Sequence, residues 1–133
     1  MRMAIAAALL AMAAGAAPAR ADGDALAGEW RIEQIAGVGA FDAAKTSFEL
    51  LPNGRMASTV GCNRMIGEPK IHGDRITFGA VAATRMACPP PLDELERKYS
   101  AALDSARTYR VEGAKLVLAD SKGAPVVVFR RPD

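Results

Sequence analysis

Short runs in which apolar and polar residues alternate make up most of the chain beyond residue 22. Trp30-Arg31-Ile32-Glu33-Gln34-Ile35 is one such run, and its near-alternation is typical of a strand with one buried face. Turn-forming residues separate the runs, as in Pro52-Asn53-Gly54. The pattern predicts about seven or eight short strands, drawn from residues 30–35, 47–51, 55–60, 70–72, 75–78, 108–112, 115–119 and 125–130.

One segment has a helical period instead. Its apolar residues recur at steps of three and four and form a single stripe; they are Leu92, Leu95, Tyr99 and Leu103. Three prolines at 89–91 force an extended entry. Glu94 and Glu96 are expected to face solvent. The spacing predicts one amphipathic helix over about residues 92–105.

Strands on both sides of a single helix favour an α+β, mostly β fold. We expect a curved antiparallel sheet or incomplete barrel, with the helix covering an open side. No repeat or long linker divides residues 22–133, and their number suits one domain.

The first 21 residues have the pattern of a cleavable secretory signal peptide. Arg2 supplies a positive start, an apolar run over 3–14 follows, and Ala19-Arg20-Ala21 offers small residues at alternate positions, as signal peptidase requires. The run is shorter than the roughly 20 residues that span a bilayer. We therefore expect a periplasmic or secreted protein without a transmembrane anchor after cleavage.

Removal of this segment changes the charge balance. Arg2 and Arg20 leave with it and no acidic residue does, which cancels the formal charge of +2 of the full chain. A near-neutral protein lacks the Lys and Arg excess on which nucleic-acid and anionic-membrane binding depend. We expect neither kind of partner, and we expect a monomer.

Export also bears on the two cysteines, Cys62 and Cys88. In an oxidising compartment an even count favours a disulfide. Closing a loop of about 27 residues would stabilise the fold by roughly 3 kcal/mol. A catalytic thiol would need a base, and the only histidine, His72, stands beside a predicted turn at the end of a strand. Metal binding is not indicated, because no Cys-x-x-Cys or His-x-x-x-His spacing is present.

Two segments mix Cys, Asn, Arg and Gly outside any apolar rhythm. They are Gly61-Cys62-Asn63-Arg64-Met65-Ile66-Gly67 and Thr84-Arg85-Met86-Ala87-Cys88. With the early Trp30, the Asn-Gly turn and the helix after the second cysteine, they resemble the META domain, the fold of the HslJ-like heat-shock and envelope proteins. The resemblance covers about residues 26–130. Met65 stands where the family usually has an aromatic residue, which preserves an apolar side chain.

The resemblance implies a small, mostly β, exported or envelope-associated protein, linked to stress and drug resistance in bacteria. It implies no cofactor and no catalytic mechanism.

The residues of the two segments allow two interpretations. Gly61 and Gly67 are typical of a bulge or sharp bend, in which Asn63 would bond nearby backbone and the arginines would pair with internal carboxylates. In the other interpretation Asn63 and Arg64 face a ligand, and Arg64 and Arg85 together bind an anion, because guanidinium groups match carboxylate or phosphate oxygens.

Three functions are consistent with these observations. The first is a non-enzymatic exported protein that supports envelope stress or drug tolerance by binding an envelope protein or a small molecule near Asn63, Arg64 and Arg85. The second is a purely structural module stabilised by its disulfide. The third, remote alternative is a thiol enzyme that uses Cys62 or Cys88.

Overall fold

The computed structural model describes residues 23–133, and the signal peptide expected at 1–21 lies outside the described residues. The described chain contains one α-helix, two 3-10 turns and ten antiparallel strands of one sheet. The strands are β1 (Gly28–Ile35), β2 (Ser47–Leu50), β3 (Met56–Thr59), β4 (Met65–Gly67), β5 (Lys70–His72), β6 (Arg75–Thr77), β7 (Ala82–Ala83), β8 (Thr108–Glu112), β9 (Lys115–Ala119) and β10 (Pro125–Arg130); the helix is α1 (Leu92–Ser105), and the 3-10 turns are η1 (Asp24–Leu26) and η2 (Ala43–Lys45). The predicted fold class is confirmed.

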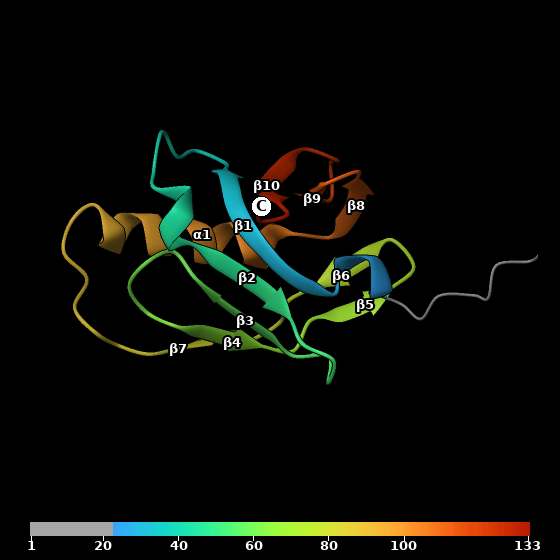
Figure 1. Cartoon of the computed structure of the whole chain (residues 1–133), viewed down its shortest axis with the longest axis horizontal. Coiled ribbons are helices and arrows are strands. Elements are labelled where there is room, and N and C mark those ends of the chain that lie inside the picture. Colours follow the sequence, from blue (N-terminus) through green and yellow to red (C-terminus); the bar gives the residue numbers. More distant parts are fainter. Residues whose placement is uncertain (1–22) are drawn as a thin grey trace, which may run out of the picture.

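The sheet curls about its longest strand, β1. The order of the strands is β5-β6-β8-β9-β10-β1-β2-β3-β4-β7. The first residues of β1 pair with β2, whereas those from Arg31 onward pair with β10. Figure 1 shows β1 running between the β2–β3–β4 group and the β8–β10 group. Changing partners along one strand lets the two halves turn toward each other, which gives a half-barrel.

The helix α1 packs against β1 and β10. Its buried side chains are Leu95, Tyr99, Ala102 and Leu103, which include three members of the predicted stripe. Trp30 is completely buried and donates from Nε1 to the Leu26 carbonyl at 2.9 Å, as expected of an aromatic residue anchoring the core. The helix and the two halves of the sheet therefore share one apolar interior.

Two strands, β4 and β7, were not among the predicted elements. Met65 of β4 pairs with Ala83 of β7, and Ile66 pairs with Ala82. β4 lies within the first Cys-containing segment, and β7 directly precedes the second. The strand count therefore exceeds the prediction because both strands lie where the sequence shows no apolar rhythm.

Tyr99 gives the fold a predictable response to alkaline pH. Complete burial raises the pKa of Tyr99 far above its ordinary value, although the hydrogen bond with Ser58 Oγ at 2.7 Å partly opposes the rise. Because the pKa of Tyr99 is raised in the folded state, the contribution of this group to the free energy of unfolding is complete below the unfolded pKa of about 10. It is lost progressively as the pH rises above that value. We expect the free energy of unfolding to fall by about 1.4 kcal/mol per pH unit above about pH 10 from this group alone.

Urea unfolding of Tyr99→Phe between pH 8 and pH 11 checks this response. At pH 8 the free energy of unfolding of the variant should be about 1 kcal/mol lower, because the hydrogen bond is missing. Toward pH 11 its free energy of unfolding should decline less steeply than that of the native protein. Ser58→Ala is the control, because it removes the same hydrogen bond but keeps the Tyr99 hydroxyl, so its stability should decline toward pH 11 as steeply as that of the native protein. Parallel curves for the native protein and Tyr99→Phe would contradict the assignment.

Candidate functional site

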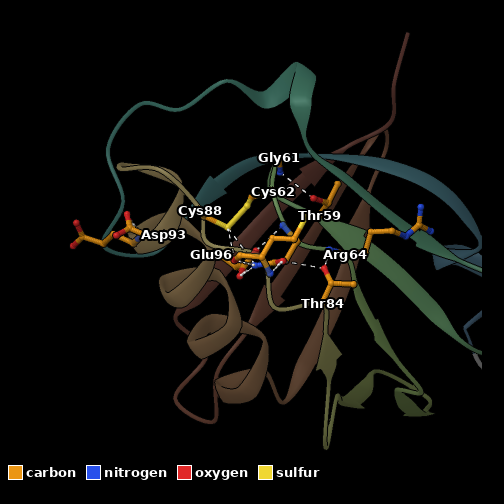
Figure 2. The surroundings of a disulfide bond; sticks show 11 residues. Thr59, Gly61, Cys62, Arg64, Thr84, Cys88, Asp93 and Glu96 are labelled. Atoms are coloured by element: carbon orange, nitrogen blue, oxygen red, sulfur yellow. Dashed lines mark hydrogen bonds between the residues drawn. A yellow bond between two sulfur atoms is a disulfide. The ribbon is translucent and has the colours of Figure 1, made fainter.

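The fold brings the two Cys-containing segments together beside the start of α1. Residues 61–64 connect β3 to β4, and residues 84–88 follow β7. A disulfide joins Cys62 to Cys88, with the two Cα atoms 6.0 Å apart (Figure 2). Gly61 opens the first segment at φ +118°, a backbone conformation that L side chains rarely adopt. The sharp turn at this glycine directs the chain from β3 into the disulfide loop.

The side chain of Asn63 holds the two segments and the helix in place. Its Nδ2 donates to Glu96 Oε2 at 2.9 Å, and to the Met86 carbonyl and Cys88 Sγ, each at 3.2 Å. Its Oδ1 accepts from Thr84 Oγ1 at 2.9 Å and from the Met86 N–H at 2.8 Å. Asn63 is 4% exposed. Its amide is therefore occupied by internal partners distant in sequence, and not by its own neighbouring backbone.

Glu96 is the residue of this network that the sequence analysis missed. We expected it to face solvent beside Glu94, but it is half-buried, and its Oε1 also accepts the Asn63 backbone N–H at 3.0 Å. The feature of the sequence that indicates its burial is its helical position, four residues after Leu92 and three before Tyr99. This position borders the apolar stripe, whereas Glu94 forms an exposed ion pair with Lys98 at 3.3 Å.

The two arginines of the segments are exposed. Within residues 23–133, neither guanidinium group makes an ion pair or hydrogen bond, so the internal carboxylates that the first interpretation requires as partners are not bound there. The backbones of Arg64 and Thr84 are joined, since the Thr84 N–H donates to the Arg64 carbonyl at 3.0 Å. In Figure 2 the side chain of Arg64 extends away from the disulfide.

Only one of these arginines lines a surface hollow near the two segments. This hollow has a volume of about 200 Å³, and Arg64 lines it together with Glu29 and Glu49. Arg85 is not among its lining residues. The structure thus places the arginines on neighbouring segments and not in a single anion pocket.

Two exposed apolar side chains accompany the arginines. Ile66 is 47% exposed and Met86 is 59% exposed. Arg64 directly precedes β4 and Ile66 lies within it; both are exposed, whereas Met65 between them is buried, as alternation along an extended chain requires. β7 ends the sheet on this side. We call the group Arg64, Ile66, Arg85 and Met86 the edge surface.

The chemistry of the disulfide region depends on the state of its sulfurs. Both are bonded to each other, and the described residues contain no free cysteine. His72, which ends β5, is not in the group of possible ligand side chains that surrounds the two sulfurs, which among the described residues consists of Cys62, Cys88 and Glu96. The Sγ atoms of Cys62 and Cys88 and a carboxylate oxygen of Glu96 lie within 4.8 Å of one another.

Between residues 23 and 133, no helix has the length and apolarity needed to cross a membrane.

Comparison with solved structures shows the same fold in distant proteins. An NMR structure of a protein from Burkholderia xenovorans is 24% identical, with a TM-score of 0.64, and the match covers 79% of this chain and 81% of that one. A crystal structure of a DUF4847 family protein from Bacteroides vulgatus is 12% identical, with a TM-score of 0.60, over 80% of this chain and 93% of that one.

No curated protein matches the chain. The family model of the META domain matches residues 24–133, which include the whole sheet, the helix and the disulfide. The chain therefore belongs to the META domain family.

Proposed function

We propose that this protein is a non-enzymatic, exported META domain that supports envelope stress or drug tolerance by binding an envelope protein through its edge surface. Export to the periplasm or beyond is favoured by the signal-peptide pattern of residues 1–21 and fits the disulfide, which persists in oxidising compartments. The protein would act as a monomer and without a cofactor.

The arginines of the edge surface, which are exposed and have no side-chain partner within residues 23–133, carry this proposal. Arginine side chains are enriched at protein interfaces, where the guanidinium fork recognises carboxylates with defined geometry. Ile66 lies two residues after Arg64 and Met86 directly follows Arg85, and these are two of the three large apolar side chains that are exposed in residues 23–133. Apolar side chains next to arginines at the end of a sheet are typical of a binding site for another protein.

The network beneath the edge surface supports binding by holding that surface rigid. Asn63, immediately before Arg64, is fixed to Glu96 and to the Met86 backbone. The disulfide at Cys88 limits the movement of the segment that carries Arg85. A surface that is already ordered loses less conformational entropy when a partner binds.

A purely structural module is the second candidate. It would be favoured by arginines that pair with carboxylates of the same chain, and the two guanidinium groups make no such pair within residues 23–133. The unpaired side chains therefore favour the binding function.

The double variant Arg64→Ala/Arg85→Ala tests the proposal in the native host. We expect cells that carry it to survive less well under envelope stress or drug challenge. The free energy of unfolding of the purified variant should stay within about 0.5 kcal/mol of the native value, as is usual for exposed substitutions. Arg75→Ala is the matched control, because Arg75 is an exposed arginine of β6, near the other end of the sheet. If the double variant unfolds, the arginines are structural; if survival is native, the edge surface is not the site.

A further inference from the structure

The disulfide and Glu96 form a compact set of side chains that can act as metal ligands. The two Sγ atoms and a Glu96 carboxylate oxygen lie within 4.8 Å of one another, and all three residues are half-buried. They come from three separate elements: the β3–β4 connection, the segment after β7, and α1. Figure 2 shows the carboxylate of Glu96 close to the disulfide.

The dimensions of the set fit a tetrahedral Zn²⁺ centre. Thiolates bind Zn²⁺ at about 2.3 Å and carboxylate oxygens at about 2.0–2.2 Å, so ligand atoms around one ion lie roughly 3.5–3.8 Å apart. The 4.8 Å span of the three atoms already approaches this arrangement. Only the bond between the sulfurs prevents both from acting as thiolate ligands.

Asn63 provides the outer support that metal ligands usually have. Its Nδ2 donates to Cys88 Sγ at 3.2 Å and to Glu96 Oε2 at 2.9 Å, and its backbone N–H donates to Glu96 Oε1 at 3.0 Å. Such hydrogen bonds fix the direction of ligand atoms, and each oxygen retains a lone pair for an ion. The carboxylate is therefore held toward the sulfurs before any metal arrives.

We propose that the reduced protein binds one Zn²⁺ through Cys62, Cys88 and Glu96, with a water molecule as the fourth ligand. A dithiol reductant supplies the two electrons and two protons that break the S–S bond and is itself converted to a disulfide. The two new thiols lose their protons to solvent when Zn²⁺ binds. Metal and disulfide are then alternative states of one position, and the ion protects the thiols from oxidation. This proposal is independent of partner binding at the edge surface.

The proposal is tested by titrating Zn²⁺ into the reduced protein, residues 22–133, under argon. A chromophoric chelator competes for the ion and reports the affinity. We expect one Zn²⁺ per reduced chain and at least about 100-fold weaker binding to the oxidised protein, because each lost thiolate removes a ligand. Glu96→Gln should weaken Zn²⁺ binding by about tenfold or more. Glu94→Gln, two residues away on the exposed side of α1, is the matched control and should bind like the native protein.

A second readout is the rate of reoxidation by glutathione disulfide. Saturating Zn²⁺ should slow this rate by about tenfold or more in the native protein and less in Glu96→Gln. Circular dichroism of each reduced sample establishes that the fold is retained. Equal Zn²⁺ affinity of the reduced and oxidised proteins, or native affinity of Glu96→Gln, would overturn the proposal.

Discussion

Replacing Asn63 by alanine is expected to lower the free energy of unfolding by about 3–4 kcal/mol, a large share of the stability of a small domain. The substitution removes all five hydrogen bonds of the amide. It leaves the Glu96 carboxylate and the Met86 backbone without these partners in a region that is partly closed to water. The loss of several partners at one buried position is among the few causes of so large an effect.

Urea unfolding of three variants measures this effect and its origin. Asn63→Asp keeps the shape of the side chain but replaces the donor with an acceptor that faces Glu96, so we expect a loss at least as large as that of Asn63→Ala. Asn53→Ala is the control, because Asn53 is exposed and accepts one local hydrogen bond from the Arg55 N–H. The free energy of unfolding of Asn53→Ala should fall by less than about 1 kcal/mol. Similar losses at Asn53 and Asn63 would show that the network does not hold the fold.

Removing the disulfide is expected to have the second largest effect. Cys62 and Cys88 are 26 residues apart, and opening a loop of this length should lower the free energy of unfolding of Cys62→Ala/Cys88→Ala by about 3 kcal/mol. For a domain of this size the melting temperature would fall by about 12 °C. Because Asn63 Nδ2 also donates to Cys88 Sγ, the losses from removing Asn63 and the disulfide should not be additive.

Calorimetry with and without a dithiol reductant gives the corresponding control. The reductant should lower the melting temperature of the native protein toward that of the double variant, and it should leave the double variant unchanged. A native melting temperature that is unaffected by reductant, in a sample whose thiols are shown to be free, would contradict a stabilising role for the bond.

Most of the fold followed from local patterns. The helix was predicted over the residues that form α1, because its apolar stripe is visible in the sequence. β4 was missed because it lies in a segment without an apolar rhythm, and β7 because it consists of only two alanines. Their pairing depends on contacts made through Asn63 and the disulfide, which join residues more than 20 positions apart. Alternation within a short window contains no such information.

The candidate site was only partly predictable for the same reason. Composition identified Cys62, Asn63, Arg64, Arg85 and Cys88 as a group. It could not tell that Asn63 faces inward while Arg64 faces outward, since this depends on the turn at Gly61 and on the position of Glu96. A carboxylate on a helix is usually exposed, and only the packing of α1 against the disulfide region makes Glu96 a partner of Asn63.

The most direct test of the central claim, that the edge surface binds an envelope partner, is photo-crosslinking in the native host. A photo-reactive amino acid at position 66 should yield a defined adduct under envelope stress, and Arg64→Ala/Arg85→Ala in the same chain should abolish it. The same probe at position 111, another exposed apolar site on β8, should yield no adduct. Equal adducts from positions 66 and 111, or an adduct at 66 that persists without the two arginines, would contradict the account.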